Sequence, residues 1–202
     1  MKKTNISLIF ISFLIFFFAI SCNTQHKNKK NGDQSTSQSA IENPDTKKTP
    51  SPEELFDRLL SSFGDDWMER EADPNLYPEY YGGAFINNNG VFVVTVTGNP
   101  AEHKKRLAEI LGTDNFQVET VHYSYRQMMR VMDSVDAFLM NSTIPEDHPL
   151  MTRFAGAYPD VMENRVKVLL TKVDDATIRL FQKDVINSPL IVFEQGELPG
   201  YN

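Results

Sequence analysis

Residues Gly83–Thr97 read GAFINNNGVFVVTVT and predict a β-hairpin. Two runs rich in β-branched and aromatic residues flank Asn89–Gly90, a dipeptide typical of tight hairpin turns. Asn99–Pro100 then places a capping residue before a proline at the first helical position, and Gly112 ends the predicted helix. The alternating run Phe116–Val121 predicts a third strand. The unit is therefore strand, strand, helix, strand.

A second unit with the same order of elements follows it. Gly156–Tyr158 opens it, and Val166–Leu170 predicts a strand after a turn at Asn164–Arg165. Asp174 or Asp175 then caps a helix, and Leu190–Phe193 predicts the last strand. A shift of 73 residues, without a gap, pairs Gly83 with Gly156, Val93 with Val166, Leu107 with Leu180 and Val118 with Ile191. This pattern predicts a duplication over about 83–121 and 156–194. The alternative is two unrelated α+β pieces.

Two further helices complete the predicted α+β fold. Residues 52–63 carry an apolar face, begin after Ser51 and end at Gly64. A methionine-rich helix over 125–140 joins the two units, and its apolar stripe is either an adaptable binding surface or, as we favour, core. Residues 65–78 predict an acidic, solvated loop. A calcium site there is the weaker alternative, because the EF-hand spacing is missing.

The N-terminal 21 residues predict a lipoprotein signal peptide. Lys2 and Lys3 precede an apolar run, Ile6–Ile20, that is shorter than a membrane-spanning helix requires. Its junction with Cys22 resembles a lipobox, which implies lipid (palmitate-type) attachment at Cys22. The alternative is a plain signal peptide or a short uncleaved anchor. Residues 22–51 are polar and predict a disordered tether that leads to a domain over 52–202. We expect a cell-envelope protein, lipid-anchored to a membrane, with its domain outside the cytoplasm.

Charge and motifs narrow the classes of function. From Pro52 onward the sequence has 24 carboxylates and 13 Lys and Arg side chains. The resulting net charge of −11 disfavours nucleic-acid binding. Cys22 is the only cysteine, and no histidine pair has metal-ligand spacing. Glu146–Asp147–His148 predicts a solvated loop, with weak metal contact as the alternative. We expect no cofactor, no metal and no enzyme activity, although a Ser–His–Asp site with dispersed members is not excluded by sequence.

Three segments carry a resemblance to a known family: Tyr77–Val94, Val121–Met129 and Glu163–Val168. Together they are similar to the pro region of alpha-lytic protease and streptogrisin-type secreted serine proteases, over roughly 77–194. The resemblance implies two small α+β lobes. It also implies a protein that catalyses the folding of a protease and inhibits it tightly.

The sequence departs from that pattern because it ends nine residues after Phe193, with no protease following. The hypothesis is a membrane-anchored, non-catalytic binding module, an inhibitor or folding chaperone of a separate secreted serine protease. The alternative is a structural or assembly lipoprotein of the cell envelope with no protease partner.

The resemblance also implies where a partner would bind. In that family the second lobe's sheet meets the protease, and the segment after the last strand lies in its cleft. The matching residues here are Leu190, Ile191, Val192, Phe193, Leu198 and Tyr201. The alternative is that the strand is buried and the tail frays, as chain ends do.

Overall fold

The predicted hairpin forms at the position that its Asn–Gly turn indicates. The computed structural model describes residues 49–198, and in it β1 (Tyr81–Ile86) pairs with β2 (Phe92–Thr97) in antiparallel fashion. The Asn87 Oδ1 accepts hydrogen bonds from the backbone N–H groups of Asn89 and Val91, both at 3.0 Å. Gly90 adopts the positive φ of 72° that closes the turn.

The first sheet is completed by a crossover. Helix α3 (Pro100–Leu111) begins after Asn99, whose side chain accepts from the Ala101 N–H, and ends at Gly112 in the left-handed conformation. Strand β3 (Gln117–Val121) then returns parallel to β2, giving the order β1-β2-β3. The core on this sheet combines Leu107 and Leu111 of α3 with Phe92 and Val94 of β2.

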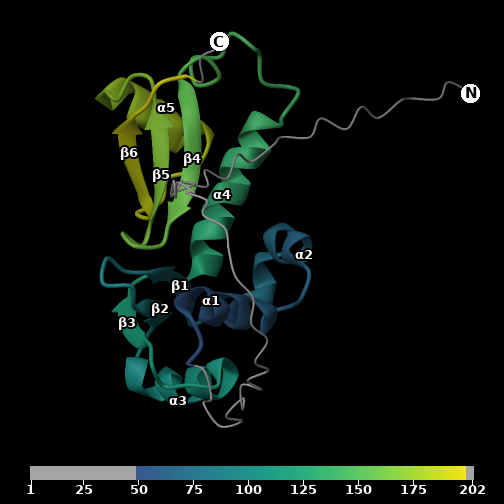
Figure 1. Ribbon diagram of the computed structural model, residues 1–202. Helices are drawn as coiled ribbons and strands as arrows, with labels where there is room; N and C mark the ends of the chain where they lie inside the picture. The colour runs from purple at the N-terminus through teal and green to yellow at the C-terminus, as the bar shows by residue number, and fades with distance from the viewer. Residues whose placement is uncertain (1–48, 199–202) are drawn as a thin grey trace, which may run out of the picture. The chain divides into compact units, whose positions relative to one another are not determined.

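The second unit repeats this order, which confirms the predicted α+β fold of two strand–strand–helix–strand units (Figure 1). Its elements are β4 (Phe154–Asp160), β5 (Arg165–Leu170), α5 (Asp175–Asp184) and β6 (Ile191–Gln195). Strand β4 is antiparallel and β6 parallel to the central β5. Of the two candidate caps, Asp174 is the one that accepts from a backbone N–H, that of Thr177.

The repeat needs gaps, so the prediction of one uniform shift is wrong. The bulges at Tyr81/Gly83 and Phe154/Gly156 are 73 residues apart. The residues of the central strands that face the cores differ instead by 74: Phe92, Val94 and Val96 in the first sheet, and Val166, Val168 and Leu170 in the second. Because side chains alternate between the faces of a strand, the proposed match of Val93 with Val166 joins opposite faces.

The same offset continues into the helix and the last strand. The fully buried Leu107 of α3 corresponds to Phe181 of α5, 74 residues later, rather than to Leu180. Val118 lies beside Val94, whereas the residue beside Val168 is Phe193, which replaces the proposed match with Ile191. The second unit therefore has one additional residue before its second strand and another before its third strand.

Helix α1 (Pro52–Ser61) covers the first sheet. Ser51 and Glu54 form a reciprocal capping box at its start. Leu55 and Leu59 are buried in the first core. The helix ends slightly before the predicted Phe63, which packs in the same core.

The prediction of an acidic loop over 65–78 is wrong. Helix α2 (Trp67–Ala72) and the short helix η1 (Pro74–Leu76) occupy it. Asp66 accepts from the Met68 N–H and Asp73 from the Asn75 N–H, so these carboxylates serve as helix caps. Among residues 49–198 no group of three or more His, Asp or Glu side chains is placed to hold a metal ion.

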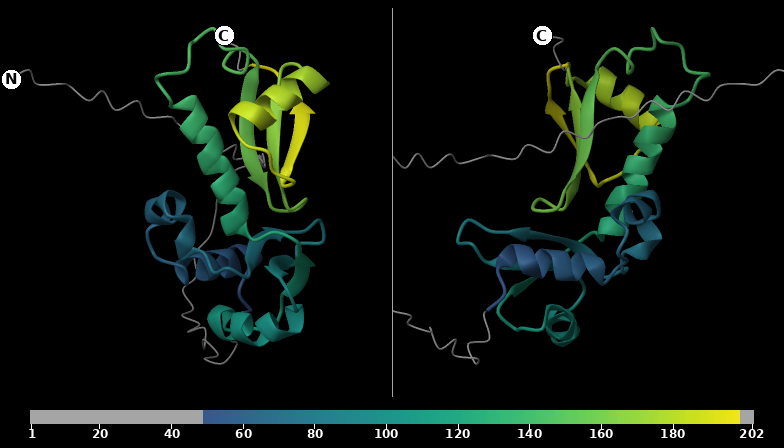
Figure 2. Two further views of the ribbon diagram at one scale, coloured as in Figure 1. Left: turned by 180° about the vertical axis from the view of Figure 1, so that it is seen from behind. Right: turned by 45° about the vertical axis from the view of Figure 1, so that its right-hand side comes forward.

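Helix α4 (Tyr125–Leu139) joins the two units (Figure 2). Met128, Val131 and Val135 are buried in the second core, and Tyr125 packs against both cores. The core interpretation of the methionine stripe is therefore confirmed. Gly83 of β1 lies close to the turn between β4 and β5. A Cβ on Gly83 would lie 2.7 Å from Val161 in that turn, so position 83 needs a residue without a side chain.

The signal peptide, Cys22, the tether up to residue 48, and Tyr201 lie outside the described residues. Within 49–198 no helix combines the length and apolarity needed to cross a membrane.

Candidate partner-binding surface

Strand β6 lies at an edge of the second sheet, as its place in Figure 1 shows. Leu190, just before the strand, accepts a hydrogen bond from the Val166 N–H, and the Gly196 N–H donates to Leu170 just after it. In a parallel ladder, residues whose backbone groups bond to the neighbouring strand alternate with residues whose backbone groups point away from it. The N–H groups of Phe193 and Gln195 therefore point away from β5, toward the free edge. An exposed edge of this kind is a template for a further strand.

The predicted partner-binding side chains are divided between the two faces. Leu190 is only 7% exposed and belongs to the second core. Ile191 and Phe193 pack partly buried against that core, with the Phe193 ring edge-on to Phe181 at 5.2 Å between centroids. Val192 alternates to the opposite face, and Leu198 is 52% exposed. The structure thus leaves the edge backbone, Val192 and Leu198 accessible, and uses Leu190 for packing.

The face that carries Val192 also holds a compact charge cluster. The Lys167 Nζ lies 2.5 Å from a carboxylate oxygen of Glu163 and 2.5 Å from one of Glu194. The hydrogen bonds that Lys167 donates to Glu163 and, second, to Glu194 raise the pKa of Lys167 above its usual range. The ammonium is nearly covered, whereas both carboxylates remain accessible. Two carboxylates around one ammonium leave one negative charge in excess beside the free edge.

Gly196 determines how the chain leaves this edge. A Cβ at Gly196 would lie 2.8 Å from the Leu169 Cβ and 3.2 Å from the Ala155 Cβ. The absence of a side chain therefore lets the start of the tail lie against the sheet, with Glu197 and Leu198 following.

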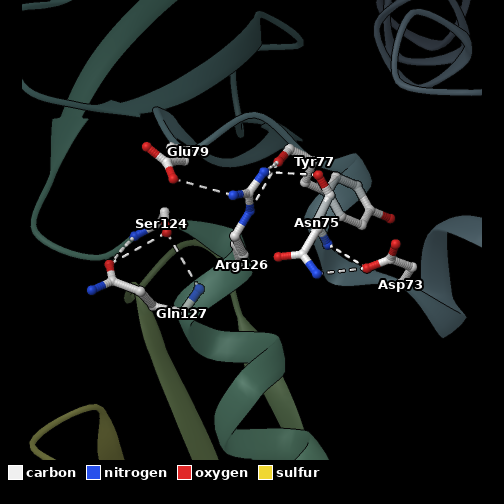
Figure 3. Close-up of polar contacts among 7 residues, drawn as sticks. All are labelled: Asp73, Asn75, Tyr77, Glu79, Ser124, Arg126 and Gln127. Atoms are coloured by element: carbon white, nitrogen blue, oxygen red, sulfur yellow. Dashed lines mark hydrogen bonds and ion pairs between the residues drawn. The ribbon is translucent and has the colours of Figure 1, made fainter.

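A second polar feature lies at the start of α4 (Figure 3). The Arg126 guanidinium donates to the backbone carbonyl of Tyr77 through Nε and Nη2, and to that of Asn75 through Nη2 at 2.8 Å. Its Nη1 also lies 3.3 Å from the Glu79 carboxylate. Arg126 and Arg130 line a cavity of about 450 Å³ with Thr97 and other polar residues.

The sequence reasoning did not single out Arg126. A cation in the first turn opposes the helix dipole, and this is the one signal that could have marked it. The backbone carbonyls of Tyr77 and Asn75 offset this unfavourable interaction with the dipole. They are about 50 residues away in the chain, and only the fold brings them next to Arg126. Arg126 therefore acts as a clamp between α4 and the first unit.

The described histidines bear on the open question of a dispersed Ser–His–Asp site. The His148 Nε2 lies 3.3 Å from Asp184, and the His148 Nδ1 accepts from the Leu150 N–H at 3.2 Å. Both ring nitrogens are engaged, so neither is available to take a proton from a serine. His103 instead stacks on Tyr80, with 4.3 Å between ring centroids.

Two family comparisons match most of the chain. Residues 38–121 match the Pro-like N-terminal domain, and residues 126–196 match the Pro-like C-terminal domain. The second match begins at Arg126, the second residue of α4, so the helix falls in the Pro-like C-terminal domain. A search of curated proteins finds no match.

Proposed function

The chain is a Pro-like protein, built from a Pro-like N-terminal and a Pro-like C-terminal domain, and from this premise we propose that it is a non-catalytic module that binds a secreted serine protease. Its action would be inhibition of the mature protease, assistance to protease folding, or both. Domains of this kind are generally non-catalytic.

The free edge of β6 is the observation that carries the proposal. A partner strand can pair with the outward N–H of Phe193 and of Gln195, so that main-chain hydrogen bonds supply affinity. Val192 would contact the added strand on one face. The tail that follows Gly196 would lie in the partner's cleft, as the resemblance to protease pro regions implies.

The charge around the edge favours a partner with a basic side chain at this contact. Glu194 lies on β6 itself, and its carboxylate is 42% exposed although it also binds Lys167. A cation on the partner strand would compensate the excess negative charge of the cluster, which adds specificity and speeds association.

An inhibition assay tests this proposal. The full chain is titrated against a panel of alpha-lytic-type serine proteases and any serine protease encoded beside it. We expect inhibition at or below micromolar concentration. Replacing residues 197–202 by a Gly–Ser segment of equal length should weaken inhibition while leaving the circular dichroism spectrum unchanged. Refolding of the denatured protease in the presence of the chain measures the chaperone activity separately.

The competing function is that of a structural or assembly lipoprotein of the envelope. It predicts no inhibition and no effect on refolding across the panel, whereas the binding proposal requires at least one of them. An absence of both, with correctly folded protein, would therefore leave the structural function.

We also propose lipid attachment at Cys22, which would hold the module at the cell envelope. The basic start, the short apolar run and the lone cysteine of the sequence support it. Cys22→Ser is expected to move the chain from the detergent phase to the aqueous phase in phase partitioning. Equal membrane fractionation of the variant and the parent would disprove the attachment.

A further inference from the structure

A groove between α1 and the edge strand β1 belongs to neither of the features described above. Phe56 of α1 and Phe85 and Ile86 of β1 line it, around a cavity of about 390 Å³. Phe56 packs edge-on against Phe92, with 6.2 Å between ring centroids, so the groove is anchored to the first core. Ile86 is 40% exposed at its mouth. The groove is therefore apolar and accessible.

Two carboxylates form the rim of this groove. Glu53 and Asp57 lie one turn apart on the same side of α1 and both line the cavity. A backbone hydrogen bond and a hydrogen bond with the Ser51 side chain lower the pKa of Glu53, which favours its charged form. The nearby Arg58 is committed elsewhere, because its Nη1 donates to the Leu111 carbonyl at 2.7 Å. Neither rim carboxylate has an ion-pair partner among the described residues.

The charge of the surrounding unit reinforces this local pattern. Residues 52–125 hold 13 carboxylates and 5 Lys and Arg side chains, whereas residues 126–196 hold 10 and 8. Residues 52–125 thus carry a net charge of −8, and residues 126–196 carry −2. A ligand for the groove must tolerate this negative potential, which excludes acidic peptides and anionic lipid and favours a cation.

We propose that this groove binds a lysine or arginine side chain presented by an extended segment of a protein partner. The methylene stem would lie on Phe56, Phe85 and Ile86, and the cationic head would lie between Glu53 and Asp57, as long basic side chains do at apolar surfaces. Strand β1 is an edge of its sheet, so the segment's backbone can pair beside its side-chain site. The groove lies on the first unit and is independent of the β6 edge.

Two tripeptides that differ in one ammonium group test the proposal. The probes are acetyl-Thr-Lys-Thr-amide and its norleucine twin, which keeps the aliphatic stem and lacks the charge. Each is titrated into the ¹⁵N-labelled full chain while amide chemical shifts are followed. We expect saturable shifts in residues 53–57 and 85–86, with the lysine probe binding about threefold or more tightly.

Variants separate the charge from the apolar floor. Glu53→Gln combined with Asp57→Asn should abolish the preference for lysine, whereas Glu109→Gln, an exposed carboxylate on α3, should preserve it. Ile86→Thr keeps a strand-forming residue and should weaken both probes. Equal binding of the two probes to the parent chain, or shifts that do not saturate or lie elsewhere, would overturn the proposal. None of these results depends on protease inhibition.

Discussion

Asn164 and Tyr123 bind each other through two reciprocal hydrogen bonds. The Asn164 Oδ1 accepts from the Tyr123 N–H at 2.8 Å, and the Asn164 Nδ2 donates to the Tyr123 carbonyl at 2.7 Å. The amide side chain thus pairs with the backbone as a neighbouring strand would. Tyr123 lies between the residues matched to the two Pro-like domains, and Asn164 lies in the β4–β5 turn. The pair therefore holds the second hairpin against the junction of the two domains.

Two substitutions at Asn164 separate its hydrogen bonds from its backbone conformation. Asn164 is 5% exposed and has a φ of +54°. Asn164→Gly keeps that conformation but loses both bonds, so it should destabilise the fold by about 1–3 kcal/mol. Asn164→Ala should cost about 1 kcal/mol more, because a Cβ disfavours the left-handed region. Urea denaturation measures both variants. An alanine variant at least as stable as the glycine variant would contradict the conformational part.

Arg126 and Arg130 offer a matched comparison on one face of α4. Arg126→Lys replaces a planar group that reaches two carbonyls with a single ammonium, so we expect a loss of about 1–2 kcal/mol in unfolding free energy. Arg130 is exposed and has no hydrogen bond or ion pair from its side chain among residues 49–198. Arg130→Lys should change stability by less than about 0.5 kcal/mol. Thermal and urea unfolding measure the stability of both variants. An equal loss of stability in the two would show that Arg126 is not a clamp.

The edge of β6 can be blocked without altering its ladder to β5. Gln195→Pro removes an outward N–H and should weaken protease inhibition about tenfold, the effect of one lost main-chain hydrogen bond plus the steric block of the ring. Gln195→Ala is the control, because it loses the side-chain bond to the Thr171 carbonyl but keeps the N–H. Inhibition constants of both variants are compared with that of the parent. Equal inhibition by the proline and alanine variants would argue against strand addition at this edge.

The tyrosine cluster in the first core predicts how the fold responds to alkaline pH. Burial, with the Glu71 charge as a smaller cause, raises the pKa of Tyr77 to about 12 from its usual value of 10.0. Burial also raises the pKa of Tyr81 and of Tyr125. The stability that these neutral phenols contribute is therefore complete below about pH 10 and is lost as the pH rises toward 12.

Absorbance at 295 nm during an alkaline titration, followed together with circular dichroism, measures this response. Tyr77, Tyr81 and Tyr125 should ionise only together with loss of structure. Ionisation of these three tyrosines near pH 10 with the fold intact would contradict the burial of the cluster.

The pattern along the chain was sufficient to predict the elements of the two repeated units, helices α1 and α4, and their order. Hairpin, capping and periodicity signals such as Asn89–Gly90, Asn99–Pro100 and the run 166–170 are local, because each depends on residues within a few positions. The same holds for the capping of α4 by Ser124 and Gln127. The acidic segment 65–78 misled the prediction because Asp66 and Asp73 favour either a loop or a helix start, and sequence alone does not distinguish the two.

Relations between distant residues were decided only by the tertiary structure. The sequence shift of 73 identified the duplication, but strand pairing and core contacts show which residues correspond, because one inserted residue moves a side chain to the other face of a sheet. The clamp of Arg126, the pairing of Asn164 with Tyr123 and the groove beside Ile86 each join segments that lie about 30 to 50 residues apart. Their partners are set by packing of whole elements against the cores, and no local pattern encodes that packing.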